Sequence, residues 1–319
     1  MLTPFLDYLI DDFGIWQHSD GEKILVDEGY SLDDAARGLI ACLALQKTNS
    51  AEVLLKYISN AHHENGFYGF ATKERKFIDY PASEDATGQV VWAMGYASAH
   101  GFHEAEAKTL VKKLDTKINT LKHARGYAYT LLGTLYLDKE LSSILATKLI
   151  KLFDGATDQW FWPESVITYG NGIIPYVLLR YASVIDDAAT AQFALRILNF
   201  IQNKCRSDRI LGPIGNEGWL RMEDALVPTF SQQPIDSAYM IWAWLAASQY
   251  FSNQEYYLRA QEWMAWFNGS NVLNAPMYNC ETLEAYDGID KKGINLHSGA
   301  ESNICLLLSL YMLENKITL

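Results

Sequence analysis

The stretch TFSQQPIDSAYMIWAWLAAS, residues 229–248, runs from a polar loop into an apolar helix. Pro234 stands at the helix start, where a missing N–H group costs no helical hydrogen bond. The carboxylate of Asp236 follows in the first turn. Because the residues after Asp236 are apolar on all sides, the helix must be buried on all sides. The stretch therefore predicts an interior helix whose first turn carries an acid.

The same arrangement recurs three times along the chain. GYSLDDAARGLIACLAL carries Asp33 and Asp34, YPASEDATGQVVWAMGYAS carries Glu84 and Asp85, and NLHSGAESNICLLLSLYML carries Glu301. Small residues follow these acids, as if a close neighbour had to fit. Four such helix starts indicate a repeated structural unit.

Helical periodicity runs through almost the whole chain, and no segment shows a convincing alternating strand pattern. The predicted helices span residues 3–12, 32–46, 51–62, 83–98, 103–118, 124–137, 140–153, 170–183, 188–204, 234–248, 254–267 and 299–314. These pair into six hairpins, each with a first helix of mixed surface and an apolar second helix. The pattern predicts one all-α domain over residues 1–319, an (α/α)6 toroid with inner and outer rings of helices.

The predicted loops fall into two classes. Those from an inner helix to the next outer helix are short, whereas most of those that lead into an inner helix are long: 13–31, 63–82, 154–169, 205–233 and 268–298. Function concentrates on long loops. We therefore expect the site at the end of the barrel where the inner helices and their acids begin.

Composition limits the partners of this protein. The 319 residues carry 26 basic and 38 acidic side chains, a net charge of −12, without a basic patch. Nucleic acid and anionic membranes are therefore not expected as partners. The four cysteines are scattered, the first residues lack a basic segment, and no apolar run reaches the roughly 20 residues of a membrane span. The sequence predicts a cytoplasmic protein.

Acids gathered at one end of a barrel suit glycoside hydrolysis. Crowded carboxylates cannot all ionise at ordinary pKa values, so one stays protonated as general acid while another acts as base. The predicted catalytic residues are Asp34, Asp85, Asp236 and Glu301, with Asp236 or Glu301 as the general acid. The alternative for each is a structural role at a helix N-terminus, which we favour for Asp33, Ser83 and Glu84.

Aromatic and polar residues near these acids are candidates for binding a sugar. Aromatic rings in loops can stack on the apolar face of a sugar, or can instead anchor a long loop to the body of the protein. The predicted substrate-binding residues are Arg37, Tyr68, Trp162, Asn171, Trp219, Gln233, Asp287, Asn295 and His297. The expected partner is a short, mostly neutral oligosaccharide. No metal or cofactor is predicted, because HExxH, phosphate-loop and GxSxG motifs are absent.

Several motifs resemble those of a known family. DDAARGL (33–39), EDATGQVVWAMG (84–95), QQPIDSA (232–238) and GINLHSGAES (293–302) resemble an (α/α)6 family encoded beside, or fused to, bacterial sugar-nucleotide glycosyltransferases. The twelve-helix plan resembles the six-hairpin glycosidase superfamily as a whole. The chain departs from the family pattern at Gln89, which replaces an arginine, and at His297, which replaces an asparagine. The resemblance implies a protein that handles carbohydrate.

Two further functions remain open at this point. A sugar epimerase or lyase would use a histidine or tyrosine base, and His297 with His62 or His63 is the feature that favours it. A non-catalytic protein that binds carbohydrate or assists a glycosyltransferase is the other alternative.

Overall fold

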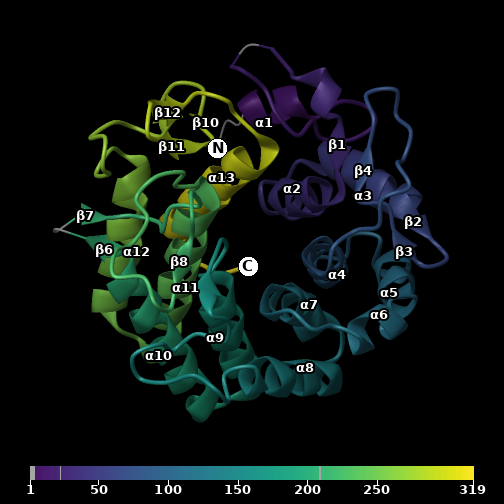
Figure 1. The fold of residues 1–319 in the computed structure, drawn as a ribbon. Coiled ribbons are helices and arrows are strands. Elements are labelled where there is room, and N and C mark those ends of the chain that lie inside the picture. Colours follow the sequence, from purple (N-terminus) through teal and green to yellow (C-terminus); the bar gives the residue numbers. More distant parts are fainter. Residues whose placement is uncertain (1–3, 22, 208–209) are drawn as a thin grey trace. The chain divides into compact units, whose positions relative to one another are not determined.

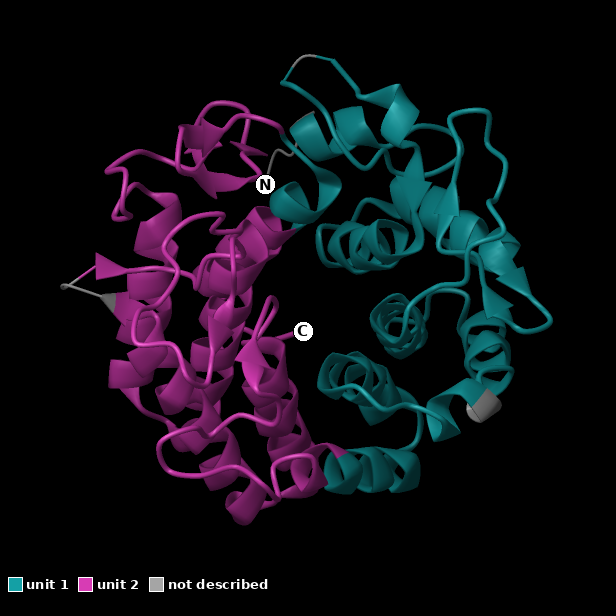
Figure 2. Ribbon diagram, in the orientation of Figure 1, with its two compact units in different colours: residues 1–148, 298–304 teal, residues 149–297, 305–319 magenta. Residues whose placement is uncertain are grey.

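The computed structural model describes residues 4–21, 23–207 and 210–319. The chain divides into two compact units (Figure 2): unit 1 comprises residues 1–148 and 298–304, and unit 2 comprises residues 149–297 and 305–319. The organisation of residues 1–319 as one domain stays a prediction. In the described part of the chain, no helix is long and apolar enough to cross a membrane.

Unit 1 is built from helical hairpins. Its helices are α1 (Pro4–Leu9), α2 (Leu32–Ala44), α3 (Thr48–Ala61), α4 (Glu84–Ala99), α5 (Glu104–Lys112), α6 (Asp115–Asn119) and α7 (Ala124–Leu137), with a 3-10 turn η1 (Val26–Glu28). Helix α2 packs against α3 and α4, and α4 packs against α5 and α7. Figure 1 shows α2, α4 and α7 in one row, with α3, α5 and α6 along one side of that row.

Unit 2 repeats this plan. Its helices are α9 (Ile173–Ile185), α10 (Ala188–Lys204), α11 (Pro234–Phe251) and α12 (Gln254–Phe267). Helix α9 packs against α10 and α11, and α11 packs against α12 (Figure 1). Two helices have residues in both units: α8 (Lys139–Lys151) and α13 (Ala300–Asn315), of which the part up to Ile304 belongs to unit 1.

The long loops contain short strands that the sequence analysis did not predict. They are β1 (Tyr30–Ser31), β2 (His62–His63), β3 (Gly66–Phe67), β4 (Phe70–Ala71), β5 (Val166–Ile167), β6 (Arg206–Ser207), β7 (Ile210–Leu211), β8 (Leu220–Arg221), β9 (Tyr278–Asn279), β10 (Glu284–Ala285), β11 (Gly288–Asp290) and β12 (Gly293–Asn295). Each pairs antiparallel with one other strand. Segments of two or three residues are too short for alternation, and pairing satisfies their backbone polar groups.

The predicted interior helices are buried around their whole circumference. Every residue of α11 from Pro234 to Ala247 is buried, and so is every residue of α7 from Ala124 to Leu135. Most predicted helices agree with the structure to within three residues at either end. The exceptions are helix 3–12, which ends at Leu9, and helix 103–118, which divides into α5 and α6.

Helices α4 and α7 approach each other through two glycines. A Cβ atom added to Gly133 would lie 2.1 Å from the carbonyl oxygen of Val91, and one added to Gly95 would lie 2.3 Å from the carbonyl oxygen of Gly133. These distances are far below van der Waals contact. The absence of side chains at both positions therefore sets the spacing of the two helices that carry Asp85 and Arg125.

Gly133→Ala is expected to lower the free energy of unfolding by at least about 1–3 kcal/mol, because the methyl group must push two backbones apart. Gly155→Ala is the matched control, since a Cβ atom there meets nothing within 4 Å; its effect should stay within about 0.5 kcal/mol. Chemical denaturation of both variants measures the difference. Equal stability of the two variants would contradict the close approach of α4 and α7.

Candidate active site

Arg37 joins acids from two helices of unit 1. The residue lies on α2 and is only 3% exposed. Its Nη2 atom donates to Asp33 Oδ2 and to Asp34 Oδ1, both at 2.9 Å, and its Nη1 atom donates to Oε2 of Glu301 in the first turn of α13. One cation therefore holds three carboxylates from two helix N-termini together.

Asp34 is the buried member of this cluster. Ser31 caps α2 by accepting a hydrogen bond from the Asp34 backbone N–H at 3.2 Å, and its hydroxyl donates to Asp34 Oδ2 at 2.6 Å. Burial raises the pKa of Asp34 to about 7, with the charges of Asp33 and Glu301 acting in the same direction against the lowering effect of Arg37 and Ser31. Near neutral pH this carboxyl is therefore partly protonated and can take up or release a proton.

The raised pKa of Asp34 makes stability depend on pH. A carboxyl whose pKa is higher in the folded state stabilises the fold fully below its unfolded pKa, and that contribution is lost as pH rises through the folded pKa. Because the pKa of Asp34 is about 4 in the unfolded chain and about 7 in the folded protein, the loss falls between about pH 4 and pH 7. A difference of about three units corresponds to at most about 4 kcal/mol.

Asp34→Asn should remove this part of the pH dependence, because the amide keeps the shape and the hydrogen bond from Arg37 but does not titrate. Unfolding free energies measured from pH 4 to pH 8 should show wild type losing stability relative to Asp34→Asn as pH rises. Asp158→Asn, at a carboxylate that is 87% exposed, serves as the control and should follow wild type. Parallel curves for wild type and Asp34→Asn would contradict the raised pKa.

The acids of the cluster differ in exposure. The side chains of Asp33 and Glu301 are 36% and 35% exposed, whereas that of Asp34 is 9% exposed. Tyr57 on α3 is buried nearby, and burial, together with the charge of Asp34, raises the pKa of its phenol. Glu301 is therefore a carboxylate that a ligand can reach. Asp34 is too buried to contact a ligand and can affect Glu301 only through Arg37, which bonds both side chains.

Asp85, in the first turn of α4, lies beside Arg125 of α7. The Asp85 Oδ2 and Arg125 Nε atoms are 3.6 Å apart, and the two side chains are 19% and 11% exposed. This is a second acid–arginine contact between helix N-termini in unit 1. Asp85 and Arg125 are thus held on two interior helices whose spacing the glycine contact fixes.

Glu84 has the structural role that the sequence predicted, although it does not cap its own helix. Ser83 caps α4 by accepting a hydrogen bond from the Ala86 N–H at 3.1 Å. Oε2 of Glu84 accepts hydrogen bonds from the backbone N–H groups of Lys122 and His123, at 3.0 and 2.9 Å. Burial opposes ionisation of Glu84, but these bonds and the His123 ring hold its pKa below the usual value. Glu84 therefore fastens the short loop before α7 to α4.

In unit 2 the corresponding acid is Asp236 in the first turn of α11. Asp236 and Asn171 are 5% and 4% exposed. The Asn171 amide donates to the Thr168 carbonyl at 2.9 Å and to Asp236 Oδ1 at 3.3 Å. Gln233 is the N-cap residue of α11 and accepts a hydrogen bond from the Asn216 amide at 2.5 Å. The predicted residues Asn171, Gln233 and Asp236 therefore lie at one end of α11.

The three predicted stacking aromatics differ in exposure. Trp219 is 39% exposed. Tyr68 is half-buried, with its ring centroid 4.5 Å from that of His63. Trp162 is only 2% exposed and packs edge-on against Phe153 at 6.2 Å. The expectation that Trp162 stacks on a sugar is therefore corrected: it anchors its loop to the core.

Asp287, Asn295 and His297 form one folded turn of the last long loop. The Asp287 N–H donates to the carbonyl oxygens of Asn295 and His297 at 3.2 and 2.8 Å. The His297 N–H donates to Asn295 Oδ1 at 3.2 Å, and the His297 side chain is exposed. Their role in binding a substrate stays a prediction.

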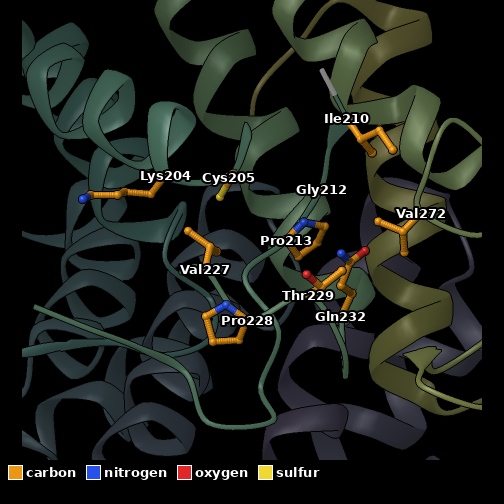
Figure 3. Close-up of a pocket in the computed structure, with 10 residues that line it drawn as sticks. All are labelled: Lys204, Cys205, Ile210, Gly212, Pro213, Val227, Pro228, Thr229, Gln232 and Val272. Carbon is orange, nitrogen blue, oxygen red and sulfur yellow. The ribbon is translucent and has the colours of Figure 1, made fainter. Parts of the chain in front are cut away.

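The loop before α11 also lines a partly open cavity of about 200 Å³ in unit 2 (Figure 3). Its polar groups include Cys205 and Gln232, and the Gln232 Oε1 atom accepts a hydrogen bond from Trp266 Nε1 at 2.8 Å. Burial and the charge of Asp236 raise the pKa of the Cys205 thiol. The charge of Asp236 therefore acts on one residue that lines the cavity.

The sequence predicts Arg37 as a substrate-binding residue and gives no role to Ser31, whereas in the structure both residues hold the acids of the cluster in place. Both carry local signals: Ser31 precedes Asp34 by three residues, the spacing of a capping box, and Arg37 follows Asp33 and Asp34 by four and three residues, which places it on their face of the helix. The contact of Arg37 with Glu301 joins residues 264 positions apart and has no local signal. Among the described residues, no group of three or more His, Cys, Asp or Glu side chains is placed to hold a metal ion.

Comparison with known proteins places the fold. No protein-family model matches the chain, and no curated protein matches its sequence. Among solved structures, a sugar epimerase from a ruminal bacterium is 14% identical, with a TM-score of 0.73 over 99% of this chain and 96% of that one. The cellobiose 2-epimerase from Bacillus thermoamylovorans is 14% identical, with a TM-score of 0.74 over 96% and 95%. A cellulase from C. cellulolyticum is 11% identical, with a TM-score of 0.58 over 97% and 89%.

Identities this low carry no information about activity. The TM-scores over nearly the full length of both chains nevertheless identify the architecture and confirm the predicted fold class. The chain has the (α/α)6 toroid fold of these solved structures.

Proposed function

We propose that this protein is an enzyme that acts on a short, mostly neutral oligosaccharide as a glycoside hydrolase. The observation that supports it most directly is the cluster of three carboxylates, Asp33, Asp34 and Glu301, that Arg37 holds together at two helix N-termini, with Glu301 about one-third exposed. A hydrolase of this kind needs one carboxyl that gives a proton near neutral pH and another that stays ionised. The net charge of −12 favours a substrate without acidic groups.

In this mechanism Glu301 is the general acid that faces the glycosidic oxygen, since its side chain is about one-third exposed. Asp34 is a positioning residue, because its carboxyl is buried behind Arg37 and acts on the charge state of the cluster. Asp85, which lies in the same unit as Glu301, is the candidate for the base that activates water. The catalytic role of Asp236 stays a prediction. Arg37 holds Glu301 in one orientation, which lowers the cost of reaching the reactive geometry.

A sugar epimerase or isomerase is the second candidate. The chain is more similar in fold to the sugar epimerase, the cellobiose 2-epimerase and a D-mannose isomerase, with TM-scores of 0.73–0.74, than to the cellulase. A fold hosts many reactions, so this similarity alone does not decide. Histidine is the commonest base for abstracting a proton, whereas the first turns of α2, α4, α11 and α13 carry acids. The residues therefore favour hydrolysis.

One experiment in heavy water separates these functions. The protein is incubated with neutral disaccharides, trisaccharides and free hexoses, and the products are followed by NMR and mass spectrometry. Hydrolysis predicts cleavage without deuterium bound to carbon. Deuterium at a sugar carbon without cleavage would replace the proposal with epimerisation or isomerisation, and binding without any product would show a non-catalytic protein.

A further inference from the structure

The long loop between α10 and α11 lines an open groove of about 460 Å³ in unit 2, a size typical of small-molecule sites. Trp219 and Phe230 are its aromatic lining residues. Its charged lining residues are Glu217, Arg221, Asp224 and Lys291. The residues that line this groove belong to unit 2, whereas those of the Arg37 cluster belong to unit 1.

The backbone of this loop holds Trp219 at the surface. Trp219 has a φ of +51°, in the left-handed region that residues with a Cβ atom rarely adopt, and follows Gly218 with a φ of +104°. The residues before it are fixed, since the N–H groups of Gly215 and Asn216 donate to the carbonyl oxygens of Pro228 and Ser231 at 2.7 and 2.9 Å. The indole remains 39% exposed although large apolar side chains favour burial. Backbone strain of this kind clusters at active sites and ligand-binding sites.

The charges of the groove balance one another. Glu217 and Lys291 form an ion pair at 2.6 Å. The Asp224 carboxylate accepts a hydrogen bond from the Arg221 backbone N–H at 2.7 Å. With two acids and two bases, the lining carries no net charge. It offers hydrogen-bond partners for hydroxyl groups beside an exposed aromatic ring, and such a surface suits a neutral sugar rather than an anion or a cation.

The groove is connected to the Asp236 carboxylate through the backbone. Strand β8 pairs with β5 so that Leu220 lies opposite Ile167. One step further along each strand are Trp219 and Thr168, and the Thr168 carbonyl accepts the hydrogen bond of the Asn171 amide that also contacts Asp236. A second connection runs from Asn216 to Gln233, the N-cap residue of the helix that carries Asp236.

We propose that this groove is a sugar-binding subsite in which Trp219 stacks on one ring of a neutral oligosaccharide whose other end extends towards Asp236. The proposal rests on the proposed carbohydrate function and adds the place where one ring of the substrate binds, with Trp219 as the residue that contacts it. A ligand of this kind gains affinity with each ring it places on the surface. The effect of Trp219 is therefore larger for a longer chain.

The test is isothermal titration calorimetry with cello-, malto- and manno-oligosaccharides of two and four sugars. Trp219→Ala should weaken binding of the preferred tetrasaccharide about tenfold or more, with a smaller effect on the disaccharide, and Trp219→Phe should recover part of the loss. Met222→Ala is the matched control, because Met222 is a 54% exposed apolar residue of the same loop that does not line the groove. Its affinities should equal those of wild type.

The outcomes separate this proposal from the proposed function. Equal affinity of wild type and Trp219→Ala for the tetrasaccharide overturns the subsite, while turnover of a sugar by both leaves the enzymatic function standing. A loss of binding in Arg221→Ala but not in Trp219→Ala also overturns it, because recognition would then be ionic. If wild type turns over a sugar but binds none of the tetrasaccharides more tightly than the disaccharides, the subsite is overturned and the enzymatic function stands.

Discussion

Glu301→Gln should lower turnover of the sugar that wild type cleaves by about 10²–10⁴-fold, the range that general acid catalysis contributes. The amide keeps the size of the carboxyl and can still accept a hydrogen bond from Arg37, but it has no proton to give to a leaving group. The Michaelis constant should change little, because the group acts in the transition state.

The control for this variant is Glu314→Gln, an exposed acid near the other end of the same helix, which should keep wild-type turnover. Circular dichroism and the unfolding midpoint establish that Glu301→Gln is folded. An aryl glycoside with a good leaving group should recover much of the activity, since its departure needs less protonation. Full activity of Glu301→Gln on the natural type of glycosidic bond would remove Glu301 from the acid role.

The helices were predictable because their signal is local and repeated. The periodicity of apolar residues predicts both ends of α10 and of α12 at the residues where the structure has them, and Pro234 predicts the start of α11. The break between α5 and α6 could not be predicted, because the segment HEAEAKTLVKKLDTKIN contains no glycine or proline. At the break, the N–H groups of Lys113 and Leu114 donate to the carbonyl oxygens of Leu110 and Val111, three residues earlier. We attribute this change of hydrogen bonding to packing rather than to the composition of the segment.

In the candidate site, too, the features with a local sequence signal could be predicted, whereas those that depend on tertiary structure could not. Helix periodicity places Asp34 and Arg37 on one face, and a proline with a following acid predicts the start that carries Asp236. The contact between Arg37 and Glu301 depends on tertiary structure and could not be derived from spacing. The exposure of loop aromatics depends on it too: Trp162 and Trp219 both lie in long polar loops, yet one is buried and the other exposed.

Arg37→Met should destabilise the protein by about 3–5 kcal/mol at neutral pH, the range measured when one partner of a buried ion pair is removed. Methionine fills a similar volume but leaves Asp34 buried beside Asp33 and Glu301 without the cation that bonds all three. Arg37→Lys should recover only part of the loss, because one ammonium group cannot reproduce the fork of the guanidinium.

The pH dependence distinguishes this electrostatic cause from lost packing. The penalty of Arg37→Met should shrink when denaturation is repeated at pH 5, where Asp34, with its pKa of about 7, is protonated and needs no cation. Combining Arg37→Met with Asp34→Asn should likewise cost less than the sum of the two changes. Arg206→Met, which breaks an exposed ion pair with Glu262, should stay within about 1 kcal/mol of wild type at both pH values. If the loss of stability in Arg37→Met is the same at pH 5 and pH 7, Arg37 stabilises the fold through its hydrocarbon stem rather than through its charge. The proposal that the charge of Arg37 orients Glu301 for catalysis would then be contradicted.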